Sequence, residues 1–177
     1  PNAATKLGKT ALHLASRGGN LKIVHALLNH PNHPADLNTT DSDGWNALHF
    51  ASERGHFDIV ELLFTHPSNP PLDPNAATKN GKTALHLASQ RGHLKIVQAL
   101  LNHRTDPPLD VNILDNNGSS VLHSASSNSR IAVVKELLGH GAALNARTAD
   151  GMTPLMMASN VAYWHSGAGR ERKRETE

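Results

Sequence analysis

The residues best suited to chemistry in this chain are its histidines, of which the 177 residues include thirteen. Imidazole titrates near neutral pH and binds transition metals, so this number raises the question of an acid–base or metal site. Ten of the thirteen, however, fall in three columns that recur along the sequence. One column, at spacings of 36, 37 and 37 residues, contains His13, His49, His86 and His123. Such regular repetition favours a structural role.

Neither a metal site nor a catalytic site is indicated by the remaining residues. His30 and His33 have a spacing found in metal sites, but only Asp36 lies near them, and zinc needs three or four ligands. The absence of cysteine excludes disulfides and thiolate ligands. There is no Gly-x-Ser-x-Gly, phosphate-binding loop or His-Glu-x-x-His motif. We therefore predict no catalytic residue, no cofactor and no metal, and we do not expect an enzyme.

The elements that must position these histidines form an internal repeat. A leucine precedes each histidine of the first column, and Leu155 continues the leucine column 33 residues after the fourth. A glycine stands four residues before each leucine and an alanine three residues after it. An aliphatic stripe follows each time, as at Ile23, Val24, Leu27 and Leu28.

Each unit is predicted to contain a turn, a helix, a second turn and a second helix. Helix N-caps are expected at Thr10, Thr83, Ser120 and Thr153, after the turn glycine. Glycines at 18–19, 55 and 92 should end the first helix. A helix pair this short cannot bury its apolar face alone, so consecutive pairs must stack against each other.

The other two histidine columns fit the second helix. His56 and His93 should stand at the N-terminus of this second helix. The third column follows the helix, where imidazole can bond free carbonyl groups. This column contains His30, His66, His103 and His140.

These motifs resemble the ankyrin repeat family over roughly residues 1–160. Thr153-Pro154-Leu155 matches the Thr-Pro-Leu-His motif except at its last position, and residues 10–13 and 83–86 keep it with Ala for Pro. The resemblance implies an all-α solenoid of helix-turn-helix units joined by β-hairpin-like loops, with about four full repeats and a partial C-terminal one. It also implies that the signature histidines bond locally to the Thr hydroxyl and nearby backbone. The positions that carry the structural motif are Thr10, Leu12, His13, Leu48, His49, Thr83, Leu85, His86, Leu122, His123, Thr153 and Leu155.

Domain boundaries follow from the repeat. We expect a repeat domain over 1–165, with units near 5–40, 41–77, 78–114, 115–147 and 148–165, and a charged flexible tail over 166–177. Residues 1–30 and 74–103 differ at only five positions, and the chain begins in the middle of this pattern. We therefore expect it to be a fragment of a longer array or of a larger protein. In the last unit the first helix should run to about His165, with Val161, Tyr163 and Trp164 closing the stack.

Three junctions carry extra, proline-rich residues, at 31–34, 67–71 and 105–108. We expect these inserts to lengthen the finger-like connections without breaking the stack. Two interpretations remain open: tolerated surface insertions, or a recognition edge specific to this chain.

A protein partner is the expected ligand, since the resemblance implies binding through turn tips and the exposed side of the first helices. The candidate binding residues are Lys6, Lys9, Arg17, Asp43, Trp45, Glu53, Arg54, Lys79, Lys82, Gln90, Arg91, Asn116 and Asn117. Trp45 is the foremost of them, because tryptophan is enriched in binding hot spots. It could instead shield the neighbouring repeat. The basic residues in this set suggest acidic segments in the partner, or merely a solvated face.

The composition argues against several classes of function. A net charge of +2 and 3% aromatic residues argue against a nucleic-acid binder. No apolar run approaches the length of a transmembrane helix, so no membrane insertion is expected. The leading hypothesis is a monomeric, intracellular protein-interaction module that acts as a scaffold or recruits a partner in the cytoplasm. The main alternative is a non-catalytic targeting part of a larger enzyme or regulator. A nuclear location is a further option, because Arg170–Arg174 is basic.

Overall fold

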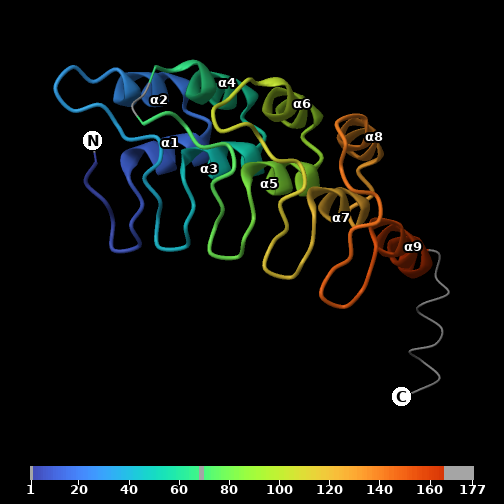
Figure 1. The fold of residues 1–177 in the computed structure, drawn as a ribbon. Coiled ribbons are helices and arrows are strands. Elements are labelled where there is room, and N and C mark those ends of the chain that lie inside the picture. Colours follow the sequence, from blue (N-terminus) through green and yellow to red (C-terminus); the bar gives the residue numbers. More distant parts are fainter. Residues whose placement is uncertain (1, 68–69, 166–177) are drawn as a thin grey trace.

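The computed structural model describes residues 2–67 and 70–165, and side chains as far as Ser159 (Figure 1). In this part of the chain there are nine α-helices and, apart from three isolated β-bridges at the turns, no strand pairing. The helices are α1 Ala11–Gly18, α2 Leu21–Leu28, α3 Ala47–Arg54, α4 Phe57–Thr65, α5 Ala84–Arg91, α6 Leu94–Asn102, α7 Val121–Ser126, α8 Ile131–Gly139 and α9 Pro154–His165.

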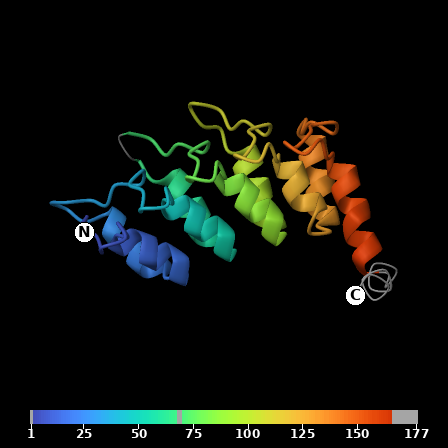
Figure 2. The same cartoon turned by 90° about the horizontal axis from the view of Figure 1, so that it is seen from below.

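The helices form two layers. The first helices of the units, α1, α3, α5, α7 and α9, lie side by side in one layer, and α2, α4, α6 and α8 form the other (Figures 1 and 2). The connecting loops extend from the layers as a row of fingers. This arrangement confirms the predicted all-α solenoid of helix pairs.

Local capping explains where the first helices begin and end. The Thr83 hydroxyl and the Ser120 hydroxyl each accept a hydrogen bond from the backbone of the signature histidine, as predicted for N-caps. Repeat two uses Asn46 instead, whose Oδ1 accepts from His49 N at 3.0 Å; this cap was not among the predicted ones. Glycines with positive φ end α1, α3 and α5. In the fourth repeat the equivalent residue is Ser129, with φ of 55°.

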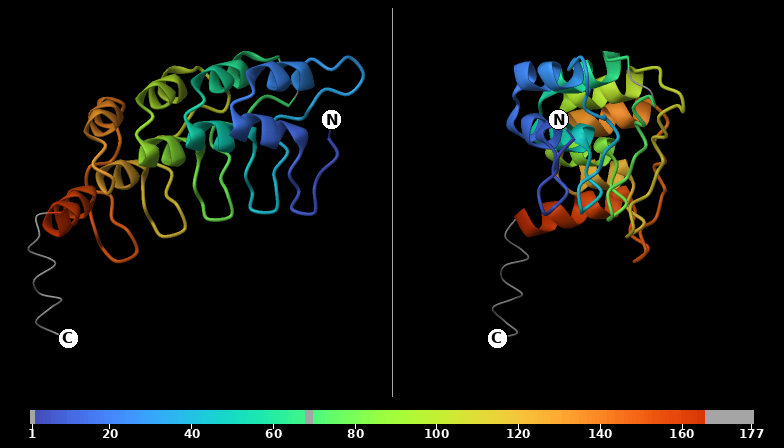
Figure 3. Two further views of the ribbon diagram at one scale, coloured as in Figure 1. Left: turned by 180° about the vertical axis from the view of Figure 1, so that it is seen from behind. Right: turned by 90° about the vertical axis from the view of Figure 1, so that its left-hand side faces the viewer.

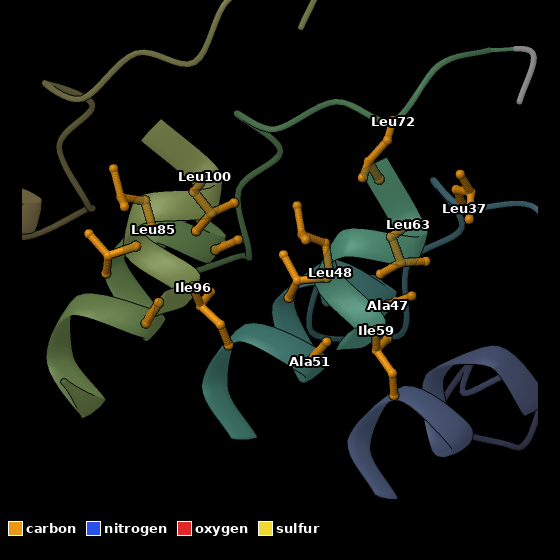
Figure 4. Close-up of a cluster of buried hydrophobic side chains, with 14 of the residues drawn as sticks. Leu37, Ala47, Leu48, Ala51, Ile59, Leu63, Leu72, Leu85, Ile96 and Leu100 are labelled. Atoms are coloured by element: carbon orange, nitrogen blue, oxygen red, sulfur yellow. The ribbon is translucent and has the colours of Figure 1, made fainter. Parts of the chain in front are cut away.

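The core runs along the stack. Leu48 of α3 is buried beside Ile59 and Leu63 of α4, and Leu85 repeats this position against Ile96 in the next unit (Figure 4). Since every unit shares its apolar side chains with its neighbours, the interior is linear and has no common centre.

The described residues of the proline-rich inserts lie between the second helices and the fingers. They occupy the second-helix end of each connection and not the turn tips (Figure 1). Leu37 and Leu72, which follow the first two inserts, are buried against the helices. The second helices still pack in order, so the expectation that the inserts leave the stack intact is confirmed.

A ladder of asparagines joins the loops that follow the inserts. The Asn75 amide donates to the Pro108 carbonyl at 2.8 Å, and its Oδ1 accepts from Asp110 N at 2.8 Å. Asn38 and Asn112 make the same pair of bonds to the next unit. Each loop is thereby tied to its successor through backbone groups.

The last unit differs from the others. The first helix, α9, extends to His165, as predicted. The equivalents of Leu155 in the four preceding units are at most 1% exposed, whereas Leu155 is 72% exposed. The side chains of Val161, Tyr163 and Trp164, and the predicted tail over 166–177, lie outside the described part of the chain.

Candidate interaction surface

The turn tips are aligned by backbone hydrogen bonds between consecutive fingers. Ser42 N donates to Leu7 O at 3.0 Å, and Lys79 N donates to Asp43 O at 2.9 Å. The same bond recurs at the next two fingers. Within a finger, the Asp41 carboxylate accepts from the backbone of Asp43 and Trp45, both at 2.9 Å. The tips therefore form a fixed row along one edge of the molecule (Figure 3).

Gly44 shows why the tips need glycine. Its φ is 79°, a region that L side chains rarely adopt, and a Cβ atom there would lie 2.9 Å from the backbone nitrogen of Lys79. The next finger approaches too closely for a side chain. Glycine thus permits both the turn and the bond between fingers.

Each signature histidine joins two repeats. In His49, Nδ1 accepts from Asn46 N at 3.1 Å, which leaves the proton on Nε2 to donate to Ala76 O at 2.9 Å. The same pattern holds for His13, His86 and His123. The local bonds implied by the family resemblance are confirmed. The bond from Nε2 to the following finger was not predicted.

Burial keeps two of these histidines neutral. Desolvation lowers the pKa of His49 to about 4, although the hydrogen bond to Ala76 opposes this shift. Desolvation also lowers the pKa of His86. A neutral imidazole suits the site, because protonated Nδ1 would face a backbone N–H group. These side chains are structural links.

The other histidine columns match the sequence prediction only in part. His56 and His93 open their helices as expected, and each bonds a carbonyl of the preceding first helix at 3.2 Å. His140 Nδ1 bonds Glu136 O at 3.0 Å, as predicted for the third column. For His66 and His103 the prediction is wrong: among the described residues, one buried ring nitrogen of each has no hydrogen-bond partner.

Trp45 lines a shallow hollow between the first two units. Its ring packs on Phe50 with centroids 5.0 Å apart, and Lys9 Nζ lies 5.5 Å from the centroid of the same Phe50 ring. The hollow has a volume of about 240 Å³. Its lining residues are Lys9, Arg17, Asp41, Asp43, Trp45, Phe50, Glu53 and Arg54. Six of the thirteen candidate binding residues therefore surround one hollow.

Glu53 partly neutralises the series of basic side chains that was predicted from the sequence. Its carboxylate bonds Arg91 at 2.6 Å and Arg54 at 3.0 Å, so it links α3 to α5 and neutralises part of both guanidinium charges. Lys9 lies 4.0 Å from Asp41. Within the described residues Lys6, Arg17 and Lys79 form no ion pair and are exposed. The surface is thus mixed in charge and less basic than the sequence suggested.

A second hollow, of about 210 Å³, lies between the third and fourth units. It contains Lys82, Gln90 and Asn117, and Lys82 Nζ donates to Gln90 at 3.3 Å. Asn116 lies outside it and bonds the Lys79 carbonyl at 2.8 Å. Nine of the thirteen candidate residues therefore line two separate hollows, and the candidates do not form one continuous site.

Other kinds of site find no support in the part of the chain that the structure describes. No three His, Asp or Glu side chains there gather as metal ligands would. None of the helices described has both the length and the apolar character needed to cross a membrane.

Comparison with known families agrees with this architecture. The family description "Ankyrin repeats (3 copies)" matches residues 1–73, 33–110, 68–148 and 107–163. The chain therefore belongs to the ankyrin repeat family, whose members generally serve in protein–protein interaction and are typically non-catalytic. A search of curated proteins found no match.

Proposed function

We propose that this chain is a non-enzymatic protein-interaction domain whose partner contacts the hollow around Trp45. The observation that carries the proposal is the tilted packing of a partly exposed tryptophan against Phe50, within a rim of cationic and acidic side chains. Aromatic anchors surrounded by polar groups are the usual composition of a binding hot spot.

Rigidity supports this assignment. Trp45 is held through its backbone by Asp41, and the finger is bonded to those beside it. A side chain that is already ordered loses less conformational entropy on binding. Arg17, which lines the hollow and forms no ion pair among the described residues, favours a partner segment that pairs an apolar side chain with a carboxylate.

The test is to measure binding with Trp45→Ala. Proteins captured from an extract of the producing cells by the wild-type chain would be identified, and the purified partner titrated against both chains. We expect the substitution to weaken binding by about 2 kcal/mol or more. Lys95→Ala, on the exposed side of α6, is the matched control and should bind normally.

Two results would contradict the proposal. If Trp45→Ala melts at a much lower temperature than the control, the tryptophan is a structural cover. If it folds and binds its partner unchanged, the contact lies elsewhere. Salt-sensitive binding of any DNA, unaffected by Trp45→Ala, would instead favour a nucleic-acid binder.

A further inference from the structure

The hollow around Trp45 and the second hollow are made by the same positions of the repeat, two units apart. Trp45 lines the first of them, and its equivalent in the fourth unit, Ser119, lines the second. Phe50 and Ser124 are another such pair. One structural feature therefore occurs twice, once with an aromatic pair and once with two hydroxyl side chains.

One pair of positions decides whether the junction between two units is bridged. Between the second and third units these positions hold Glu53 and Arg91, which form an ion pair at 2.6 Å. Between the first and second units they hold Arg17 and Arg54, and both line the hollow around Trp45. Two guanidinium groups carry only donors and repel each other, so they leave this junction unbridged.

The second hollow has a neutral version of this pair. Gln90 and Asn128 stand at these positions between the third and fourth units, and both line the second hollow. Gln90 Oε1 accepts from Lys82, and Asn128 Nδ2 donates to the Ser124 carbonyl at 2.9 Å. Among the described residues, Gln90 Nε2 and Asn128 Oδ1 form no hydrogen bond. The hollow therefore offers a ligand one uncharged donor and one uncharged acceptor.

We propose that the partner segment is extended, and that an asparagine or glutamine side chain of it binds in the second hollow. This rests on the proposed function, because the same segment places its apolar and acidic side chains at the hollow around Trp45. A primary amide carries both a donor and an acceptor, so it can pair with Gln90 and Asn128 together. A carboxylate can only accept, and its negative charge would face Asn128 Oδ1.

The separation of the two hollows sets the spacing of the two contacts. The hollows lie two units apart along the layer of first helices (Figure 1). Packed helices are about 8–10 Å apart, so the hollows are separated by about 16–20 Å. An extended chain advances about 3.3 Å per residue, so the amide should stand about five or six residues from the apolar side chain.

A helical segment fits this surface less well. The hollows have volumes of about 240 and 210 Å³, so each is smaller than the pockets of about 300–1,000 Å³ that hold whole small molecules, and each accepts only one or two side chains. A helix would need about 11–13 residues to span both hollows, and its backbone groups are already paired. An extended segment keeps backbone groups available for exposed side chains along the row, such as Asn117.

The experiment selects binders to the full chain from a display library of random peptides long enough to span both hollows. We expect a consensus in which a large apolar residue beside Asp or Glu stands about five or six positions from Asn or Gln. Synthetic peptides with this consensus are then titrated by calorimetry. Replacing the amide residue of the peptide by Ala should weaken binding at least about fivefold, because two neutral hydrogen bonds are lost.

Gln90→Arg is the most informative variant of the chain. The equivalent residue in the nearly identical first repeat is Arg17, and a lysine stands eight positions before each of them, so the substitution should leave the fold intact. Peptides selected on this variant should carry Asp or Glu in place of the amide. Their affinity relative to the amide peptides should rise about tenfold. Lys22→Ala, on the exposed side of α2, is the matched control and should bind both kinds of peptide like the wild type.

Several results would overturn the proposal. They are the absence of any enriched peptide, a carboxylate or no fixed residue at the second contact of wild-type binders, and a spacing of about 11–13 residues, as in a helix. Competition by a synthetic peptide of residues 166–177 would assign the hollows to the chain's own C-terminal residues and would also overturn it.

The proposed function is tested separately by Trp45→Ala. Peptides that lose affinity for Trp45→Ala but tolerate replacement of their amide residue would overturn the inference about the second hollow and leave the proposed function intact. Peptides that need the amide residue but bind Trp45→Ala as tightly as the wild type would support the amide contact and contradict the proposed function.

Discussion

His49 of repeat two donates through Nε2 to the carbonyl oxygen of Ala76, which stands directly before the finger of repeat three, at 2.9 Å. The bond spans 27 residues of sequence and fixes the finger of one unit to the first helix of the unit before it. Because its other ring nitrogen accepts from Asn46, the link requires a neutral imidazole. The stability of the stack is therefore coupled to pH.

We predict that the chain loses stability between pH 6.5 and about 4. Unfolded His49 titrates near its usual 6.5, whereas its pKa in the folded state is about 4, so in this range the unfolded chain binds a proton that the folded chain does not. The contribution of His49 is present in full above pH 6.5 and decreases by about 3 kcal/mol as the pH falls to 4.

Urea denaturation at a series of pH values measures this effect. His49→Gln should be less stable than the wild type at pH 7.5, with a smaller loss on acidification. If the stability difference between the two chains is the same at pH 7 and pH 4.5, His49 is not the titrating group.

Ser129→Gly should stabilise the protein. Ser129 has φ of 55°, in a column where the other three repeats have glycine. Relieving a non-glycine residue of a left-handed conformation is worth about 1 kcal/mol. The free energy of unfolding would be measured by denaturant titration. Gly55→Ser is the reverse control: it should destabilise, since its Cβ would lie 2.8 Å from the His93 ring. A lower stability for Ser129→Gly would contradict the assignment of strain.

Leu85→Ala and Leu155→Ala should differ sharply in how much stability the protein loses, although both leucines stand at the same position of the repeat. Leu85 is 1% exposed, and its truncation should cost about 2–5 kcal/mol. Leu155 is 72% exposed, and its truncation should change stability by only about 0.5 kcal/mol. Thermal and urea unfolding of both variants checks this. Equal losses would mean that a segment outside the described residues covers Leu155.

Asn75→Ala should weaken the contact between repeats two and three. The substitution removes two hydrogen bonds to the next loop, each with a net contribution of about 0.5–1.5 kcal/mol. Hydrogen exchange of the Asp110 amide should accelerate accordingly. Asn145→Ala is the control in the same column, because Asn145 is exposed and makes no such pair among the described residues. Equal effects of the two substitutions would show that the ladder does not stabilise the stack.

The sequence by itself determined the units of this protein. A leucine column, a glycine at each turn and an aliphatic stripe define two short helices per unit, because helix periodicity and capping depend on residues only a few positions apart. The sequence also predicted that consecutive units stack, since so short a helix pair cannot bury its own apolar face. The extent of α9 was likewise predictable, and the family resemblance implied the local bonds of the signature histidines.

Only the tertiary structure decided how the units are joined and which side chains meet. The bond from His49 to Ala76, the pairing of Glu53 with Arg91 and the asparagine ladder join residues about 27 to 38 positions apart. No local pattern encodes these contacts, because they depend on how one unit is rotated and offset against the next. Position along the stack also matters: α8 packs on α6 and buries Val97, whereas Val134 of α8 stays partly exposed among the described residues, although both valines stand at one position of the repeat.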